Sequence, residues 1–402
     1  MAARGPPGRR VTMLTAAPIY LDYNATTPID PAVNDAMEPF LQQHFGNPSS
    51  THPYGRTASD ALASARRQVA SLLGADDIEI VFTGSGSEAN NLALKGLVFR
   101  ALATGPAEDL QIVTSAIEHP ALAETCRFLE RLGCRITTLP VDECGVVDVD
   151  ALRTALRRRT LVVSVMHANN EVGTIAPIRE IADLAHEHGA LVHTDAAQSV
   201  GKIGVDVDEL GVDLLTVAGH KLYAPKGIGA LYVRRGVELE PLVHGGGQEG
   251  SRRAGTENVP YAVGLGAACE IAQRRLPAAT PRLAALSERL WRGLEGALGD
   301  RVVLNGHPHE RLPNTLNVSF LGAVGADLLA RTPEIAASTG SACHEGDAGS
   351  SSVLDAMGVP PERSRAAIRL SVGRLTTPEE IDTTTDLLAS RAGTAHQSVA
   401  HA

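Results

Sequence analysis

Imine chemistry has few possible positions in this chain, because only four of its 36 lysine and arginine residues are lysines. Arginine does not form an imine with an aldehyde near neutral pH, so such chemistry depends on these four side chains. One of them, Lys221, follows an apolar, β-branched run typical of a buried parallel strand, and Asp195 ends an earlier run of the same kind. An amine and a carboxylate at the ends of neighbouring strands are what pyridoxal phosphate (PLP) requires, as imine partner and as counter-ion of the pyridine nitrogen.

A glycine- and serine-rich segment, Phe82–Asn91, follows an expected strand and opens an expected helix. Its glycines let the backbone approach an anion, Ser87 adds a hydroxyl, and the helix start adds free N–H groups and the positive end of a dipole. The spacing matches neither the dinucleotide-binding nor the Walker pattern, so a nucleotide is not expected. The segment predicts either a phosphate site or an ordinary strand-to-helix turn capped by Ser87.

Further polar positions after strands provide groups that could hold an aromatic cofactor ring. His119 could stack on a ring face, although a histidine at such a turn is also often satisfied by local hydrogen bonds. An asparagine of the segment Asn169–Thr174 could reach a phenolic oxygen, and Gln198 could face the same site from the next helix. His220 could hydrogen-bond a phosphate. Asp195 would keep the ring nitrogen protonated, which makes the ring an electron sink for a carbanion at the substrate's Cα.

The elements that position these residues alternate short β-branched runs with amphipathic stretches, which predicts a mostly parallel α/β sheet. The expected strands are Ile78–Thr83, Gln111–Ser115, Arg135–Leu139, Leu161–Met166, Ala190–Thr194, Leu214–Ala218 and Gly229–Val233. The expected helices are Ser87–Ala103, Pro120–Leu132, Val149–Arg157 and Ile178–His188.

Beyond residue 260 the pattern changes to two long helices, Tyr261–Arg275 and Thr280–Leu298, joined by the proline-rich link Leu276–Pro281. Short strands are expected around Asn314–Phe320 and Ala367–Val372. This change predicts a second, smaller α+β domain, to which the N-terminal part returns. The predicted organisation is a leader at 1–18, a small α+β domain at 19–30 and 261–402, and a large PLP-binding α/β domain at 31–260.

The composition excludes several classes of function. At 402 residues the chain can bury large cores, and its 44% apolar and 20% charged residues are ordinary for a globular protein. A net charge of −10 argues against a nucleic-acid-binding surface, and no apolar run is long enough to predict a membrane span. The segment Met1–Pro18 lacks a signal-peptide pattern and predicts a disordered leader, with Met13 as an alternative initiator.

Five cysteines are scattered along the chain without metal-ligand spacing, so no metal site is predicted and a reducing cytoplasm is expected. Cys126, Cys134, Cys144 and Cys269 are expected to be ordinary thiols of helices, strands or turns. Cys343 differs, because the surrounding Ser338–Ser352 is small, polar and glycine-rich, which predicts a mobile loop. Taken alone, an exposed cysteine in such a loop is often incidental.

Several segments together resemble the cysteine desulfurase/selenocysteine lyase family, with similarity from about residue 19 to 385. These segments are Ile19–Pro28, Phe45–Ser50, His193–Lys202, Ala218–Tyr232 and Gly245–Thr256. The resemblance implies a class V aminotransferase-like protein of PLP fold type I: a large α/β domain with a mostly parallel sheet plus a smaller α+β domain.

The resemblance also implies roles for single residues. Lys221 is implied as the Schiff-base lysine and catalytic base, and Asp195 as the partner of the pyridine nitrogen. The remaining implied cofactor contacts are His119 on the ring face, Asn170 and Gln198 near the phenolic oxygen, and Gly86, Ser87 and His220 at the phosphate. Thr256 is implied to reach the phosphate of a neighbouring subunit, hence a homodimer with shared sites.

Two positions depart from the family pattern. Many members carry a phosphate-binding serine where this chain has Ala218, and an Ala-Thr pair where it has Gly86-Ser87. Ser87 retains a hydroxyl, so the departures imply that one phosphate contact is missing or that Thr216 supplies it.

The sulfur chemistry follows from the same resemblance. Cys343 stands in the family's Ser-Ala-Cys context, which implies the catalytic thiol. Arg369 lies on an expected short strand of the second domain, and its guanidinium is expected to clamp the substrate carboxylate through two parallel hydrogen bonds, with help from Asn47. The alternative for Arg369 is a surface salt bridge.

The implied reaction converts L-cysteine to L-alanine and leaves a persulfide on Cys343 for a protein sulfur acceptor, as in iron–sulfur cluster assembly. A selenocysteine lyase that releases selenide and L-alanine from L-selenocysteine would use the same residues. Two further alternatives are a sulfur-relay scaffold whose activity depends on a partner, and an aminotransferase, which needs no loop cysteine.

Overall fold

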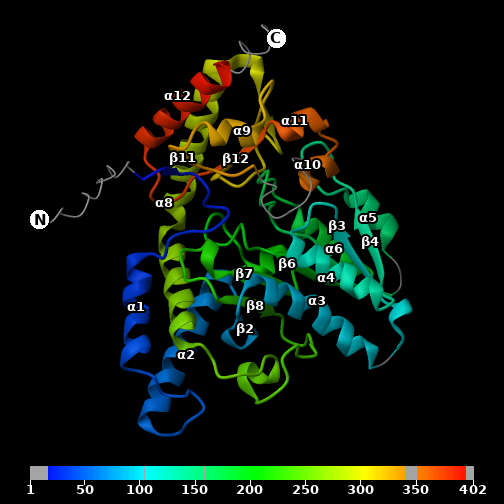
Figure 1. Ribbon diagram of the computed structural model, residues 1–402. Helices are drawn as coiled ribbons and strands as arrows, with labels where there is room; N and C mark the ends of the chain where they lie inside the picture. The colour runs from blue at the N-terminus through cyan, green and yellow to red at the C-terminus, as the bar shows by residue number, and fades with distance from the viewer. Residues whose placement is uncertain (1–16, 104, 157–158, 340–350, 395–402) are drawn as a thin grey trace, which may run out of the picture.

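A seven-stranded mixed sheet forms the centre of the protein in this computed structural model, which describes residues 17–103, 105–156, 159–339 and 351–394. Its strands lie in the order β2-β8-β7-β6-β5-β3-β4 (Figure 1). Their bounds are β2 Ile80–Thr83, β3 Gln111–Ser115, β4 Arg135–Leu139, β5 Thr160–Ser164, β6 Leu191–Asp195, β7 Leu214–Ala218 and β8 Gly229–Val233. Only β8 runs against its neighbours in this sheet, so the predicted mostly parallel arrangement is confirmed.

Helices cover both faces of this sheet, because consecutive apolar residues of a strand point to opposite sides. Ile112 belongs to a cluster with helices α3 and α4, whereas the next residue, Val113, belongs to the cluster on the other face. The helices of this part are α1 Pro31–Gln42, α2 Pro53–Leu73, α3 Gly86–Leu102, α4 Pro120–Arg131, α5 Val149–Ala155, α6 Ile178–Glu187 and α7 Val207–Leu210.

A smaller antiparallel sheet, in the order β12-β10-β9, lies above the first in Figure 1. Its strands are β9 Val302–Asn305, β10 Thr315–Phe320 and β12 Ala367–Ser371. The N-terminal strand β1, Ile19–Tyr20, pairs in parallel with β11, Ile335–Ala336, so the start of the described chain returns to this part as expected. The surrounding helices are α9 Gly325–Ala330, α10 Ser352–Ala356, α11 Pro361–Arg365 and α12 Pro378–Thr394. The exact domain limits stay a prediction.

One prediction about the helices is wrong: the two helices expected around Leu276–Pro281 are a single helix, α8, Val259–Leu298. Proline removes one backbone donor and crowds the carbonyl four residues before it, which is why a break was expected. Pro277 and Pro281 are four residues apart and both exposed, so the disturbed carbonyls lie on one side of the helix where water can solvate them. The apolar faces before and after the prolines stay packed in the two large hydrophobic clusters.

Across the residues that the structure describes, no helix is both long and apolar enough to cross a membrane. The expected leader falls almost wholly on residues 1–16, outside the described residues.

Candidate active site

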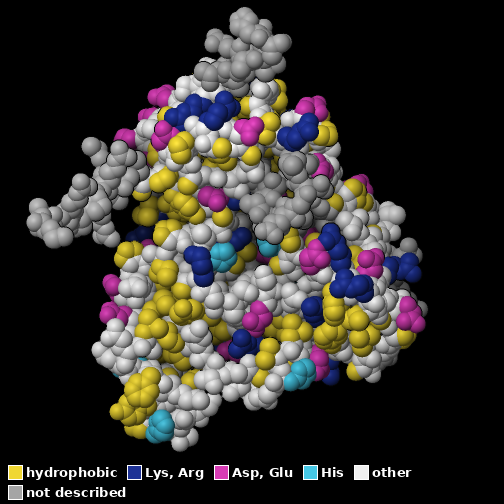
Figure 2. All heavy atoms as spheres, viewed as in Figure 1, with side chains coloured by type: hydrophobic (Ala, Val, Ile, Leu, Met, Phe, Trp, Pro, Cys, Tyr) yellow, Lys and Arg dark blue, Asp and Glu magenta, His cyan; other side chains and the backbone are white. Residues whose placement is uncertain are grey.

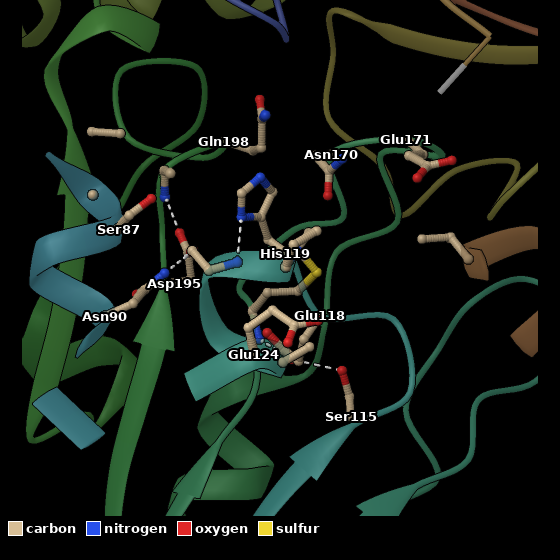
Figure 3. A pocket seen from close by; sticks show the side chains of 18 of the residues that line it. Ser87, Asn90, Ser115, Glu118, His119, Glu124, Asn170, Glu171, Asp195 and Gln198 are labelled. Carbon is tan, nitrogen blue, oxygen red and sulfur yellow. Dashed lines mark hydrogen bonds between the residues drawn. The ribbon is translucent and has the colours of Figure 1, made fainter. Parts of the chain in front are cut away.

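A cavity of about 760 Å³ opens where the strands β2, β3, β5, β6 and β7 end (Figure 3). In a sheet of this type, the carboxyl ends of the parallel strands and the helix starts that follow them are the usual ligand site. The polar and charged residues lining it include Asp22, Asn24, Ser87, Asn90, Glu118, His119, Asn170, Glu171, Asp195, Gln198, His220, Lys221, Ser338 and Arg369. The small sheet contributes Arg369 from β12, so both parts of the chain build the cavity.

Lys221 and Asp195 enter this cavity from neighbouring strands, as the sequence predicted. Asp195 is the last residue of β6 and is buried, with 7% of its surface exposed. Its Oδ2 accepts a hydrogen bond from Asn90 Nδ2 at 2.7 Å, and its Oδ1 accepts one from the Ala197 N–H at 2.9 Å (Figure 3). Lys221 ends the short turn η3, Gly219–Lys221, directly after β7.

The start of helix α3, where a phosphate site was predicted, lines the cavity, and its cap is Ser85 and not Ser87. Ser85 Oγ accepts from the Glu88 N–H at 3.1 Å, which leaves Ser87, an exposed residue, free to face the cavity. A Cβ at Gly86 would come within 3.0 Å of the Ala218 Cβ, so the small residue keeps the backbone open there. The helix has 17 residues, enough for a full dipole at this end.

The suggestion that Thr216 replaces the family's serine is wrong. Thr216 is the central residue of β7 and is fully buried, and its Oγ1 is 3.1 Å from His193 Nε2. Its side chain therefore does not line the cavity, and Ala218 contributes no hydroxyl there. The anion donors that remain are the helix start, Ser87 and His220, whose Nδ1 is 3.2 Å from Thr26 Oγ1.

Both cavity histidines are held in the neutral form. Burial, then the nearby Lys221, lowers the pKa of His220 to about 4, and the same causes lower the pKa of His119. His119 is the N-cap of α4, and its Nδ1 accepts from the Ala121 N–H at 3.1 Å. The alternative of a histidine satisfied in its turn is therefore correct for one ring nitrogen, while the ring itself lines the cavity (Figure 3).

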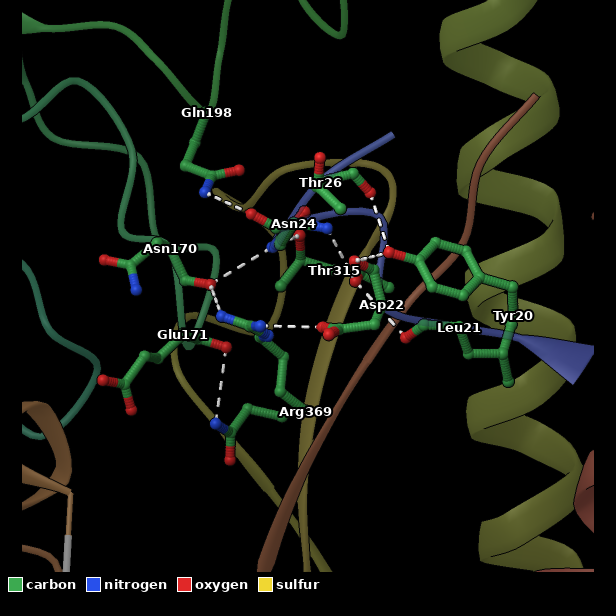
Figure 4. A network of polar contacts seen from close by, with 12 residues as sticks. Tyr20, Leu21, Asp22, Asn24, Thr26, Asn170, Glu171, Gln198, Thr315 and Arg369 are labelled. Carbon is green, nitrogen blue, oxygen red and sulfur yellow. Dashed lines mark hydrogen bonds and ion pairs between the residues drawn. The ribbon is translucent and has the colours of Figure 1, made fainter. Parts of the chain in front are cut away.

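Arg369 lines the cavity from β12 and is not a surface residue, because only 7% of its side chain is exposed. Its Nη2 donates to Asp22 Oδ1 at 2.8 Å and its Nη1 to the Asn170 carbonyl at 3.0 Å (Figure 4). Its Nε is buried and has no protein partner within the described part of the chain. An arginine whose two Nη atoms are held by the protein, and which has N–H groups without a partner, is suited to bind a carboxylate.

Two predicted site residues lie elsewhere. Asn47 precedes α2 and does not line the cavity; its Oδ1 accepts from the Ser49 N–H. Its expected help for Arg369 therefore has no support within this chain. Thr256 is exposed and also lies outside the cavity lining.

Cys343 lies outside the described residues, but the segments that flank it are described. Ser338 lines the cavity and pairs with Arg369 in an antiparallel bridge. On the other side, Ser351 Oγ donates to Glu171 Oε2 at 2.6 Å. The chain therefore leaves and re-enters the described structure beside the cavity. Of the remaining cysteines, Cys126, Cys134 and Cys269 are buried and Cys144 is half-buried.

Several residues of the cavity were not identified from the sequence. Asn90 holds Asp195, and Glu118 Oε1 accepts from Ser115 Oγ at 2.6 Å and from the Met166 N–H at 2.8 Å. Burial raises the pKa of Glu118 to about 8. The signal in the sequence was the Glu118-His119 pair after β3, because titratable groups with shifted pKa values cluster at functional sites.

Comparisons with known proteins agree with this geometry. The aminotransferase class-V family model matches residues 19–384. The chain is 48% identical to the cysteine desulfurase IscS of Dictyoglomus turgidum over 372 residues, which covers 92% of this chain and 93% of that protein. A solved NifS-like protein superposes with a TM-score of 0.87 at 36% identity, covering 94% of this chain and all of the other. SspA, solved in complex with cysteine, superposes with a TM-score of 0.78 at 38% identity, covering 88% and 98% of the two chains.

Proposed function

The chain belongs to the aminotransferase class-V family, and from that membership we propose how its cavity carries out cysteine desulfuration. The protein is a PLP-dependent cysteine desulfurase. One observation supports the residue roles above all: Lys221 and Asp195 enter a single cavity from adjacent strands, and the start of α3 and the buried Arg369 line the same cavity.

The residues of the cavity fit the chemical groups of PLP. A phosphate needs N–H and O–H donors, which the start of α3, Ser87 and His220 supply. A protonated ring nitrogen needs a buried carboxylate, which is Asp195, and an aldehyde needs the amine of Lys221. Asn90 Oδ1, Thr114 Oγ1 and Glu118 Oε2 are buried polar atoms of cavity-lining residues with no partner among the described residues. When bound, the cofactor would supply an electron sink for a negative charge at the substrate Cα.

The proton transfers belong to Lys221 in this proposal. With L-cysteine bound, the amine of Lys221 would remove the proton from the substrate Cα and return protons to the product. The carboxylate of Asp195 would stabilise the positive charge on the protonated ring nitrogen. Its orientation is fixed by Asn90 and the Ala197 N–H. The neutral His119 presents an uncharged ring to the cavity, which suits stacking on an aromatic cofactor.

Arg369 binds the carboxylate of L-cysteine, and this contact turns the substrate sulfur toward the segments that flank Cys343. The Cys343 thiolate attacks that sulfur, the bond between sulfur and Cβ breaks, and the electron pair returns to the substrate carbon skeleton. Protonation then yields L-alanine, and Cys343 retains a persulfide for a protein sulfur acceptor. The approach of Ser338 and Ser351 to the cavity supports this role for the segment between them.

The enzyme is proposed to work as a homodimer, with Thr256 reaching the neighbouring subunit's phosphate. Thr256 is exposed, and its loop is tied to the start of α3 by an ion pair between Arg253 and Glu88 at 2.9 Å. An apolar patch lies over the loop between α1 and α2, at the lower left of Figure 2, and contains Phe45, 74% exposed, and Tyr54, 59% exposed. A second copy of the chain is the proposed cover of these surfaces.

A cytoplasmic location is proposed because the four described cysteines are unpaired thiols, the state that a reducing compartment maintains. Iron–sulfur cluster assembly is the proposed use of the sulfur, in keeping with the name of the relative from Dictyoglomus turgidum.

Two substitutions test the assignment. Lys221→Ala is expected to lose the visible absorbance of protein-bound PLP and to form no alanine. Cys343→Ala is expected to keep that absorbance and to show no added sulfur atom by mass spectrometry after exposure to L-cysteine, whereas the wild type gains one on Cys343. A wild-type protein that takes up no PLP would contradict the proposal. Comparing L-selenocysteine with L-cysteine as substrate in both proteins measures how far Cys343 is needed for each.

A further inference from the structure

A buried lysine, Lys202, lies directly behind a residue of the cavity. It is 7% exposed and does not line the cavity itself. Its Nζ donates to Gln198 Oε1 at 2.9 Å and to Asn24 Oδ1 at 3.3 Å, and both acceptors line the cavity. Lys202 therefore contacts the site only through other side chains.

Burial of this amine costs free energy, because its described acceptors are neutral amide oxygens and no carboxylate compensates its charge. Burial, and then the nearby charges of Lys221 and Arg369, lower the pKa of Lys202 well below its ordinary value. An aliphatic side chain of similar volume would avoid this cost. The amine at this position therefore has a use other than stability.

The contacts of Gln198 indicate that use. A side-chain amide can rotate by half a turn with little change in shape, so its orientation depends on what surrounds it. Here its oxygen faces a group that donates, Lys202 Nζ, and its nitrogen faces a group that only accepts, the Asn24 carbonyl, at 3.0 Å (Figure 4). The Asn24 carbonyl cannot donate to the oxygen of a rotated amide, and a protonated Lys202 cannot accept from its nitrogen. The second N–H of Gln198 is then the donor that the amide has left for a group in the cavity.

Asn24 is itself held by the start of β10 and by the turn after β5, which keeps this arrangement rigid. Its Nδ2 donates to Thr315 Oγ1 at 2.9 Å and to the Asn170 carbonyl at 3.2 Å, and its Oδ1 also accepts from Asn314 Nδ2 at 3.0 Å (Figure 4). The anchor of the Gln198 amide is therefore fixed on both sides of the cavity.

We propose that Lys202 is a positioning residue that locks the Gln198 amide with its N–H toward the cavity, so that Gln198 donates to the ionised phenolic oxygen of PLP. The inference rests on the proposed function, because it needs PLP in this cavity. Donation favours the ionised oxygen and lowers the pH at which the protein-bound cofactor loses its proton.

The test is a pH titration of the visible absorbance of the holoenzyme. Lys202→Met keeps the volume and removes the donor, and we expect the spectroscopic pKa to rise by about one unit, the effect of one hydrogen bond. Lys95→Met is the matched control, because Lys95 lies on α3 over the Phe128 ring, outside the cavity lining, and should leave the titration unchanged.

A double-mutant cycle separates orientation from charge. The charged and titratable groups that line the cavity are present in every variant; they are Asp22, Glu118, His119, Glu124, Cys126, Arg127, Glu130, Glu171, Asp195, His220, Lys221 and Arg369. If Lys202 acts through Gln198, Lys202→Met should add no shift to a Gln198→Ala protein. A shift of equal size in both backgrounds would mean a direct charge effect and overturn the proposal, as would no shift in the single variant.

Two further outcomes are distinguishable. If Lys202→Met does not fold, Lys202→Gln, which retains N–H donors, replaces it and should shift the titration less than Gln198→Ala does; a larger shift would count against the proposal. A wild-type protein without visible absorbance after incubation with PLP would contradict the proposed function instead.

Discussion

The role of Arg369 can be tested by keeping its charge and changing its shape. In the structure Nη1 donates to the Asn170 carbonyl and Nη2 to Asp22, which uses two of the five guanidinium N–H groups and leaves three, on Nε, Nη1 and Nη2. A lysine at this position has three donors, two of which the same partners would take. Arg369→Lys should therefore offer the substrate carboxylate one point contact in place of a planar pair.

The lost interaction is one charge-assisted hydrogen bond, which contributes roughly 1.5–3 kcal/mol. At about 1.4 kcal/mol for each factor of ten, the KM for L-cysteine should rise about ten- to hundredfold. The kcat should change less, because the contact is made to a part of the substrate that does not react. Visible absorbance of bound PLP should persist, which shows that the site is intact.

The assay is alanine formation against L-cysteine concentration, with Arg374→Lys as matched control. Arg374 is a half-buried arginine that pairs with Asp30 at 3.4 Å and does not line the cavity. Its replacement should leave the KM near the wild-type value. A KM within twofold of wild type in Arg369→Lys would refute the assigned role.

Three further outcomes are expected. Burial raises the pKa of Glu118 from 4.5 to about 8 in the folded protein, so between these pH values the folded state binds one proton more than the unfolded state. The stability that this proton contributes is full below about pH 4.5 and is lost as the pH rises toward 8. In denaturant unfolding of the cofactor-free protein, Glu118→Gln should therefore gain stability relative to wild type from pH 5 to pH 8, and a constant difference would contradict the buried carboxylate. Glu249→Ala should lower the unfolding free energy by about 3–5 kcal/mol, because the Glu249 side chain is 2% exposed and paired with an arginine at 2.6 Å. Asp382→Ala, at an exposed ion pair, should cost far less, and equal losses would argue against the burial. Among the described thiols, Cys269, which is buried and has a raised pKa, should label far more slowly with a thiol reagent than Cys144 as followed by mass spectrometry, and the reverse order would be inconsistent with the packing.

The sequence predicted the parts of the site that depend on strand ends. An apolar run sets where a strand stops, so Lys221 and Asp195 had to lie at one edge of the sheet, and β7 and β8 have the predicted bounds. No role was predicted for Lys202, because its partner Asn24 is 178 positions away and no local pattern joins them. The roles of the site residues themselves stay predictions.

The continuous helix was missed for a related reason. Local rules place a break at Pro277 and Pro281, whereas the packing of the residues on either side decides the outcome. The cap of α3 was assigned to Ser87 and not Ser85 because both serines stand at the strand-to-helix turn, and only backbone angles distinguish them.

Helix α8 contributes residues to both large hydrophobic clusters. Its first half packs with α1 and α2 against the large sheet, and its second half packs with α12 in the cluster of the small sheet. If either hydrophobic cluster unfolds, α8 loses packing contacts, and the other cluster depends on the same helix. Heat or denaturant should then dismantle both sheets together, and the cavity between them should vanish in the same step.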